Sequence, residues 1–218
     1  MKYNLDFAVL ATDIAVLTVT DKDLRILVTT AKSENFRGMP TLPGGLVGAS
    51  EMSKDAADRI LGDVLNSTNF YKEQLYTFDD PKRDPAGRVV SVAYLMLVPW
   101  NVASKVTKEN ASWVPVKKLP KLAYDHDEIT KWAIKRIVRK VKYTNIVYSL
   151  MPAEFKLSDL QKVYEIVLGV KIDKRNFVKK IKSLKLLTKT GHKVEGAAHR
   201  PAVLYKFTNR EYKVVEVF

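Results

Sequence analysis

The chain contains no cysteine among its 218 residues, which excludes disulfide bonds and thiolate chemistry. It has no apolar run of about eighteen residues or more, so we expect no membrane-spanning helix. The N-terminal stretch is interrupted by Asp6 and Asp13 and carries only Lys2 as an early positive charge, which is not typical of a signal peptide. We therefore expect a cytoplasmic protein that does not contact a membrane.

Acidic residues are scarce in the C-terminal part, and the positive charge is therefore unevenly distributed. The formal net charge is +13. Residues 1–116 hold 13 Lys and Arg against 14 Asp and Glu, whereas residues 143–218 hold 15 against 7. A surface that is simply rich in lysine would spread its charge evenly. The asymmetry favours an acidic partner for the C-terminal part, with nucleic acid ahead of an anionic membrane.

The most informative stretch is residues 42–66, LPGGLVGASEMSKDAADRILGDVLN. Gly45, Glu51 and Arg59 have the spacing of the first three fixed positions of a Nudix box, G-x5-E-x7-R-E-U-x-E-E-x-G-U, where U is a bulky aliphatic residue. Apolar residues recur at helical spacing over residues 53–65, so this part is expected to be a helix. The stretch therefore resembles a Nudix box on a loop and the helix after it.

Several positions of the box lack their carboxylates. Residues 60, 63 and 64 share one helix face, where an active Nudix enzyme presents carboxylates to the magnesium that bridges pyrophosphate oxygens. Ile60 and Val64 cannot bind a hard cation, and Glu51 and Asp63 are weak metal candidates at most. We therefore predict no catalytic residues, no required cofactor and no hydrolase activity. The scaffold would be retained for binding.

Strands are expected over residues 7–20, 25–30 and 89–98, which are rich in β-branched and other apolar residues. A polar loop, residues 79–88, precedes the last of them and contains two arginines. A solvated hairpin loop is one interpretation of it; in the other, the arginines bind phosphate or carboxylate. The predicted ligand-binding residues are Arg37, Glu51, Arg59, Arg83 and Arg88.

A helix is predicted over residues 125–141, with Asp125 as its N-cap and Glu128 completing a capping box. No glycine or proline linker follows over residues 140–146, so the connection to the next domain is expected to be short or helical. We predict two domains, residues 1–142 and residues 143–218.

The second domain has the pattern of a winged helix-turn-helix. Helices are expected over residues 145–150, over 158–168 with Gly169 as the stop, and from the cap Asp173 to about Leu184. Phe177 and Ile181 lie on the inner face of the third helix, and a basic stripe lies on the opposite face. Two strand candidates, residues 186–190 and 202–207, would form the wing. This order of elements is typical of a DNA-binding domain whose third helix enters the major groove.

The whole chain resembles the Nudix-related transcriptional regulators, which join a Nudix-like domain to a C-terminal winged helix. The similar stretches are LPGGLV (42–47), EQLYTFDDPKRDPAGRVVSVAYL (73–95), LPKLAYDHDEI (119–129), FKLSDLQKVYEIVLGVKIDKRNFVKKI (155–181) and HRPAVLYKF (199–207).

The resemblance implies an α+β protein, with an α/β/α sandwich around a mixed sheet followed by a winged helix-turn-helix. It implies a repressor of NAD or sugar metabolism that binds palindromic double-stranded DNA as a homodimer. ADP-ribose or a related metabolite would be the effector. By the family pattern, Lys174, Arg175 and Asn176 open the recognition helix, and Arg200 and Pro201 belong to the wing. The full set of expected DNA-binding residues is Lys174, Arg175, Asn176, Lys179, Lys182, Lys193, His199 and Arg200.

Two other functions are compatible with parts of the sequence. The first is a Nudix hydrolase of ADP-ribose-like nucleotides with a basic appendage, against which Ile60 and Val64 argue. The second is an RNA-binding or scaffold protein that uses its basic C-terminal part without sequence specificity. The effector, the operator and the direction of regulation are not encoded in any motif.

Overall fold

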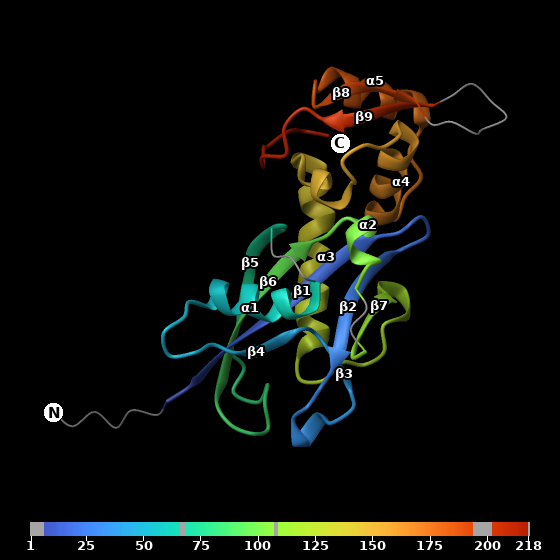
Figure 1. The fold of residues 1–218 in the computed structure, drawn as a ribbon. Helices are drawn as coiled ribbons and strands as arrows, with labels where there is room; N and C mark the ends of the chain where they lie inside the picture. The colour runs from blue at the N-terminus through green and yellow to red at the C-terminus, as the bar shows by residue number, and fades with distance from the viewer. Residues whose placement is uncertain (1–6, 66–68, 107–108, 194–201, 218) are drawn as a thin grey trace. The chain divides into compact units, whose positions relative to one another are not determined.

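The computed structural model describes residues 7–65, 69–106, 109–193 and 202–217, and these form two compact units (Figure 1). The first unit comprises the chain up to Leu17, together with Arg25–Leu97 and Lys105–Ile134. The second comprises Thr18–Leu24, Val98–Ser104 and Lys135–Phe218. One helix, α3 (His126–Tyr143), contributes residues to both units. The connection over residues 140–146 was predicted to be short or helical, and α3 ends at Tyr143 within this range.

The first unit is built on a mixed β-sheet. Its central strand, β1 (Val9–Val19), pairs in parallel with β6 (Val89–Leu97), and the sheet order is β3-β2-β1-β6-β5. Both strands are nearly continuous runs of buried apolar residues, as expected where a sheet is covered on both faces. The other pairs are antiparallel, and they involve β2 (Leu24–Thr30), β3 (Pro40–Thr41), β4 (Gly44–Leu46), β5 (Tyr71–Phe78) and β7 (Ala111–Pro115).

Two helices cover this sheet. Figure 1 shows α1 (Ser53–Leu65) in front of the strands and α3 behind them, which confirms the predicted α/β/α arrangement. Each helix buries one apolar stripe at helical spacing: α1 buries Ala57 and Leu61, and α3 buries Ile129 and Ala133. Short helical segments complete the connections: η1 (Glu34–Phe36), α2 (Trp100–Ala103) and η2 (Val116–Lys118). No helix in the described part of the chain has the length and apolarity to cross a membrane.

The C-terminal part has the predicted winged-helix order. It contains η3 (Ile146–Leu150), α4 (Leu157–Leu168), α5 (Lys174–Ser183), β8 (Leu187–Lys193) and β9 (Val203–Phe207). Gly169 ends α4 with a left-handed φ of 69°, a conformation that favours glycine. The β8–β9 hairpin is antiparallel, and Phe155 extends its sheet by exchanging backbone hydrogen bonds of 2.9 and 2.8 Å with Tyr205.

Aromatic side chains form the centre of the winged helix. Tyr164 of α4 and Phe177 of α5 are buried, with ring centroids 5.6 Å apart in an edge-to-face arrangement. Phe155 and Phe207 are also buried, with centroids 5.2 Å apart, and they fix the hairpin against the segment before α4. Such pairs stabilise a small domain beyond the apolar area they bury. The orientation of α5 is thus set by its buried face, which leaves its opposite face free.

Asn145 holds the C-terminal residues beside the end of α3. Its side chain is buried, its Nδ2 donates to the Glu211 carbonyl at 2.8 Å, and its Oδ1 accepts from the Lys213 amide at 2.7 Å. The Asn145 amide also donates to the Lys213 carbonyl at 3.1 Å. One buried amide side chain therefore satisfies two backbone groups that are far away in sequence.

We expect Asn145→Ala to lower the free energy of unfolding of the C-terminal unit by about 2 kcal/mol, because two backbone groups lose their buried partner. Urea denaturation followed by circular dichroism measures this loss. Asn209→Ala is the matched control, since Asn209 lies in the same C-terminal segment but its side chain bonds are exposed. Equal losses for the two variants would contradict the role assigned to Asn145.

Candidate ligand cleft and nucleic-acid interface

A cleft of about 840 Å³ lies in the first unit, between α1, the sheet and the start of α3. The α1 face that closes one side of it carries Arg59, Ile60, Asp63 and Val64. The box positions 60, 63 and 64 therefore share one helix face toward the cleft, as their spacing predicted. The remaining wall comes from β1, from the ends of β2 and β7, and from the loops before β4 and α3.

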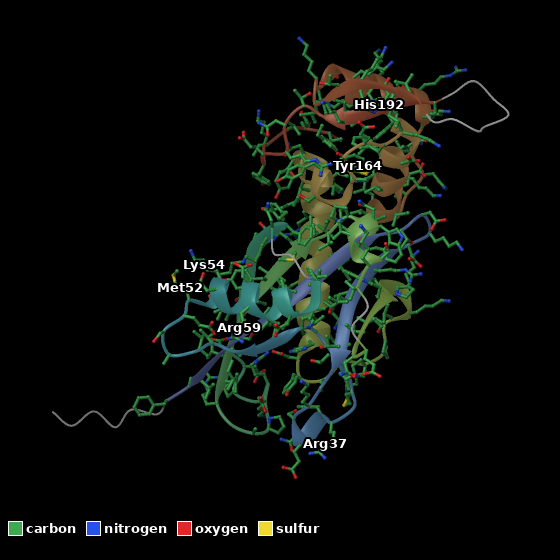
Figure 2. All side chains as sticks on the ribbon, in the orientation of Figure 1. Arg37, Met52, Lys54, Arg59, Tyr164 and His192 are labelled. Atoms are coloured by element: carbon green, nitrogen blue, oxygen red, sulfur yellow. The ribbon has the colours of Figure 1, made fainter. Side chains whose placement is uncertain are left out.

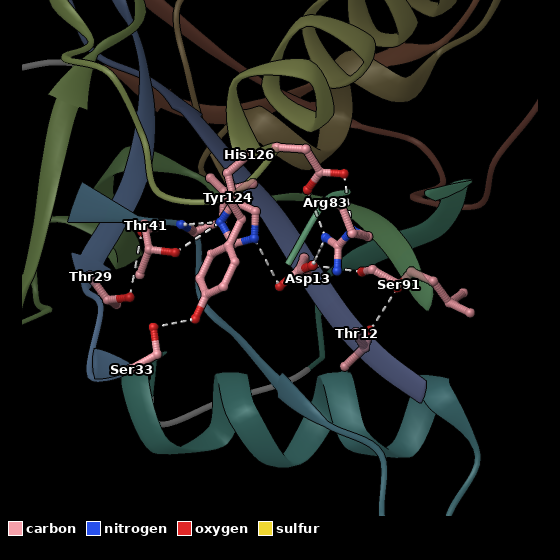
Figure 3. A network of polar contacts seen from close by, with 12 residues as sticks. Thr12, Asp13, Thr29, Ser33, Thr41, Arg83, Ser91, Tyr124 and His126 are labelled. Carbon is pink, nitrogen blue, oxygen red and sulfur yellow. Dashed lines mark hydrogen bonds and ion pairs between the residues drawn. The ribbon is translucent and has the colours of Figure 1, made fainter. Parts of the chain in front are cut away.

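The floor of the cleft is a buried carboxylate, Asp13 of β1 (Figure 3). Its Oδ2 accepts a hydrogen bond of 2.6 Å from the Ser91 hydroxyl of β6 and one of 3.1 Å from Arg83 Nη2. Its Oδ1 lies 3.3 Å from Nε2 of His126 in the first turn of α3. Three segments that are far apart in sequence therefore meet on one carboxylate.

The electrostatic balance at Asp13 favours its ionised form. Burial by itself raises the pKa of a carboxyl group, but the contacts of Asp13 with His126, Ser91 and Arg83 outweigh this and lower its pKa far below the ordinary value. Burial by itself lowers the pKa of Arg83. The hydrogen bonds and charges of Asp125 and Asp13 outweigh this effect, so the pKa of Arg83 is raised. The pair is therefore fully charged at neutral pH.

Arg83 joins Asp13 to the segment that begins α3. Its Nη2 is 2.7 Å from Oδ1 of Asp125 and its Nε is 3.0 Å from Oδ2, a bidentate pair in which the guanidinium is almost fully buried. α3 begins directly after Asp125, as predicted, and the Asp125 carbonyl accepts hydrogen bonds from the Glu128 and Ile129 amides at 2.9 and 3.3 Å. The predicted capping box between the side chains of Asp125 and Glu128 was wrong. The Asp125 carboxylate binds Arg83 instead, and the Glu128 side chain binds Lys131 on the surface.

His126 is oriented by hydrogen bonds at both ring nitrogens. The Leu42 amide donates to Nδ1 at 3.1 Å, so Nδ1 is an acceptor and the ring proton lies on Nε2, where it is donated to Asp13. The Thr41 hydroxyl lies 2.9 Å from the same Nδ1. The imidazole therefore connects the strand before the Nudix-like box to the buried carboxylate.

The Asp13 carboxylate leaves no space for a side chain at Gly44. A Cβ atom built on Gly44 would lie 2.1 Å from Asp13 Oδ1 and 3.1 Å from the Thr12 carbonyl oxygen. The next residue, Gly45, is less confined, because its Cβ would meet only the Ile60 side chain at 3.4 Å. The LPGG sequence thus allows β4 to approach β1 closely enough to cover Asp13.

Glu51 and Arg59, two of the recognised box positions, form an ion pair. Arg59 Nε donates to Glu51 Oε2 at 3.2 Å, and Arg59 Nη2 also bonds Oε1 of the same carboxylate. The Gly48 amide donates to Glu51 Oε1 at 2.8 Å, and Arg59 Nη2 donates to the Leu46 carbonyl at 3.1 Å. The bonds from Arg59 and Gly48 lower the pKa of Glu51. The pair therefore closes the loop between β4 and α1.

The cleft side of α1 is a poor site for a divalent cation. Ile60 and Val64 supply no oxygen, and Glu51 is already bound by Arg59 and the Gly48 amide. Within the described residues, no group of three or more His, Asp or Glu side chains is placed to hold a metal ion. Among the three box positions on this helix face, only Asp63 offers oxygen ligands to a magnesium ion.

The structure separates the predicted ligand-binding residues into groups. Arg59 and Arg83 line the cleft, and Glu51 reaches it only through Arg59. Arg37 and Arg88 are exposed and lie outside its lining; Figure 2 shows Arg37 on the connection between β2 and β3, pointing away from Arg59. Arg88 donates to the Asp79 carbonyl at 2.5 Å and thereby closes its own loop.

Sequence reasoning did not identify Asp13, His126 or Tyr124 as residues of the cleft. A signal for Asp13 was available, since it is the single charged residue in the apolar strand β1. Tyr124 has a φ of 55°, which is rare for a residue with a side chain, and its hydroxyl donates to Ser33 Oγ at 2.7 Å. Such strained backbone is frequent at functional sites. No local spacing in the sequence predicts the positive φ of Tyr124.

The second candidate site is the outer face of α5. Asp173 caps the helix by accepting a 2.8 Å hydrogen bond from the Asn176 amide, as predicted. Phe177 and Ile181 are buried. The opposite face is exposed and basic, and the predicted DNA-binding residues on it are Lys174, Arg175, Asn176, Lys179 and Lys182.

The wing is described in part. The β8–β9 hairpin is present, and His192 near its tip places Nδ1 3.0 Å from a Glu154 carboxylate oxygen; Figure 2 labels His192 beside α5. Lys193 is the last residue of β8. The predicted contacts His199 and Arg200, with Pro201, lie outside the described residues.

Two family models match the chain. One describes the NUDIX domain and matches residues 10–133, which covers the sheet, α1 and the cleft. The other describes the NrtR DNA-binding winged helix domain and matches residues 147–207, which includes α4, α5 and the hairpin. The two matches follow one another without overlap.

Three similar proteins span one or both parts. A relative from Acinetobacter baylyi, named ADPR responsive transcriptional repressor NtrR, is 31% identical over 209 residues, covering 92% of this chain and 82% of the relative. An ADP-ribose pyrophosphatase from Methanocaldococcus jannaschii is 30% identical over 119 residues, covering 54% of this chain and 70% of the relative.

Shewanella oneidensis NrtR is the third similar protein. Its crystal structure complexed with a 27mer DNA gives a TM-score of 0.81 at 29% identity, covering 91% of this chain and 93% of that one. The structure of its NUDIX domain complexed with ADP ribose gives a TM-score of 0.52 at 25% identity, covering 61% of this chain and 90% of that one.

We expect Gly44→Ala to lower the free energy of unfolding by about 3 kcal/mol, because the added Cβ cannot coexist with the Asp13 carboxylate. Differential scanning calorimetry of the purified variant would show a lower melting temperature. Gly45→Ala is the matched control and should melt close to the wild type. A Gly44→Ala variant as stable as that control would contradict the packing described here.

The lowered pKa of Asp13 predicts a pH dependence of stability. Its contribution is complete above the pKa of an unfolded aspartate, about 4, and is lost as the pH falls toward the lower folded value. Asp13→Asn should therefore be less stable than the wild type at pH 7, and the difference should shrink as the pH is lowered from 4 to 3. Urea denaturation at several pH values measures the gap. A gap that widens in acid would refute the assignment.

Proposed function

The chain belongs to the family of transcriptional regulators that join a Nudix domain to an NrtR-type winged helix, and we propose that it is a repressor that responds to ADP-ribose. The first 142 residues would sense the metabolite, and residues 143–218 would bind operator DNA. Binding of the effector would favour a conformation of the protein with a lower affinity for the operator.

The observation that carries the proposal is the two-faced helix α5. Its inner face packs on α4, and its exposed face presents basic and amide side chains from its first turn onward. The first residues of a recognition helix are those that reach base edges in the major groove. Arg175 has the guanidinium that pairs best with guanine, and Asn176 has the amide that pairs with adenine. The DNA complex of Shewanella oneidensis NrtR, which matches across both units of this chain, supports a DNA-binding role for the winged helix.

The cleft supports a nucleotide-like effector. Its volume of about 840 Å³ is ample for a molecule of the size of ADP-ribose. The Acinetobacter baylyi relative is named as ADPR responsive, and the NUDIX domain of Shewanella oneidensis NrtR is complexed with ADP ribose. Arg59 and Arg83 are the expected ligand-binding residues that reach this space.

We propose that the domain binds its effector without hydrolysing it. Two of the three box positions on the cleft face of α1 are aliphatic, and Glu51 is engaged by Arg59. The similarity to the ADP-ribose pyrophosphatase of Methanocaldococcus jannaschii makes hydrolysis of ADP-ribose the alternative function. It is tested by incubating the protein with ADP-ribose and magnesium and following release of AMP by chromatography. AMP release that Asp63→Asn abolishes would replace the binding model with the hydrolase.

We further propose a homodimer on a palindromic operator, because two copies of one recognition helix read two symmetric half-sites. Light scattering after size-exclusion chromatography gives the mass in solution. A mass near twice the 24.7 kDa of one chain would support the dimer, and a monomer at the concentrations used for DNA binding would overturn it.

The regulator is tested by fluorescence anisotropy on DNA fragments from upstream of this gene and its neighbours. The titrations use near-physiological salt, a shuffled fragment as control, and buffer with or without ADP-ribose. Sequence-dependent binding that ADP-ribose relieves is the expected result. Binding without preference over the shuffled fragment would reject the repressor in favour of nonspecific nucleic-acid binding.

Arg175→Ala should weaken binding to the operator by roughly tenfold to a hundredfold, because a bidentate contact with a base is lost. Its effect on the shuffled fragment should be much smaller. Lys162→Ala, which removes an exposed lysine of α4, is the matched control for the loss of one positive charge. Equal losses on operator and shuffled DNA would show that Arg175 contacts phosphate only.

A further inference from the structure

The charges of the cleft raise the question of which side chains receive an anionic ligand. Among the described residues, three that carry a positive charge line it: Lys32, Arg59 and Arg83. Arg83 is neutralised by Asp13 and Asp125 and is almost fully buried. The charge of Arg59 is compensated by its two bonds to Glu51. Neither guanidinium offers an uncompensated positive charge to a ligand.

Lys32 differs from both arginines. Its side chain is exposed, and within the described part of the chain it forms no ion pair or hydrogen bond. Lys32 is one of the residues that line the cleft, directly after the end of β2. A lysine ammonium with three donors and no carboxylate partner is a suitable group for a phosphate oxygen.

The backbone at Lys32 is held on both sides. Before it, the Ala31 amide donates to the Met39 carbonyl at 2.8 Å, and the Gly38 amide donates to the Ala31 carbonyl at 3.1 Å. After it, Ser33 Oγ accepts the 2.7 Å hydrogen bond from the Tyr124 hydroxyl. The loop therefore positions the lysine at the rim of the cleft, so that binding a ligand need not order the backbone.

The acidic residues of the cleft make the positive charge of Lys32 more important for binding an anion. Asp63, Asp84 and Glu109 also line the cleft, and none of them forms an ion pair within the described residues. Unpaired carboxylates accept hydrogen bonds from sugar hydroxyls but repel phosphate. Without Lys32, the described residues of the cleft would present negative charges and two compensated arginines to a phosphorylated ligand.

We propose that Lys32 binds the phosphate groups of the effector and sets the preference of the cleft for a phosphorylated ligand. The inference rests on the proposed function, since it takes the cleft as the effector site. It assigns to one lysine the neutralisation of the phosphate charge at this cleft. The expected ligand class is a sugar linked to phosphate or diphosphate, with its hydroxyl groups directed toward the carboxylates of Asp63, Asp84 and Glu109.

The test is isothermal titration calorimetry of the full-length protein with ADP-ribose. Lys32→Gln should weaken binding by roughly tenfold to a hundredfold, the loss expected for one charge-assisted contact. Lys32→Arg should retain most of the affinity, because it keeps the positive charge. The matched control is Lys118→Gln, an exposed lysine outside the cleft. The melting temperature of each variant without ligand shows whether its fold is intact.

Salt dependence supplies a second readout. The affinity of the wild type for ADP-ribose should fall as potassium chloride is raised, and that of Lys32→Gln should fall less steeply. Wild-type binding that Lys32→Gln leaves unchanged, or that Lys118→Gln weakens equally, would overturn the role of Lys32 alone. A wild type that does not bind ADP-ribose would overturn the proposed effector, and this assignment with it.

Discussion

The structure of the Nudix domain depends on one buried carboxylate, Asp13. An ionised group removed from water is several kcal/mol unfavourable unless it is paired and hydrogen-bonded. Ser91, Arg83 and His126 meet that requirement, and they come from a neighbouring strand, a polar loop and the first turn of α3. The charge of Asp13 is therefore paired only when these segments have folded together. The same contacts define the floor of the cleft, so the stability of the domain and the shape of its site have a common origin.

Local patterns were sufficient for most of the elements. Apolar periodicity and end signals predicted α1, α4 and α5, and they placed residues 60, 63 and 64 on one face. Long-range pairings could not be read in this way. Asp125 looked like a helix cap because its nearest neighbours in sequence suit that role, yet its partner is Arg83, 42 residues away. Which carboxylate an arginine meets is decided by the tertiary fold. No local spacing within a single sequence identifies that partner.

The winged helix shows how one helix is divided between packing and recognition. The burial of Phe177 against Tyr164 fixes the rotation of α5 about its axis, and every basic side chain opposite is then directed outward. Binding energy on DNA comes mostly from phosphate contacts, whereas discrimination comes from the few groups that reach base edges. An exposed helix face with lysines along its length and Arg175 and Asn176 in its first turn contains both kinds of group.

The close contact of Gly44 with Asp13 bears on how such a domain evolves. The positions that the fold cannot change are the glycine and the buried carboxylate, and neither belongs to the metal-binding carboxylates of the box. Carboxylates clustered on one helix face repel one another, and Ile60 and Val64 introduce no such repulsion into α1. The scaffold therefore does not depend on carboxylates at these two positions. A change in what the α1 face carries would leave the cleft and the buried charge beneath it in place.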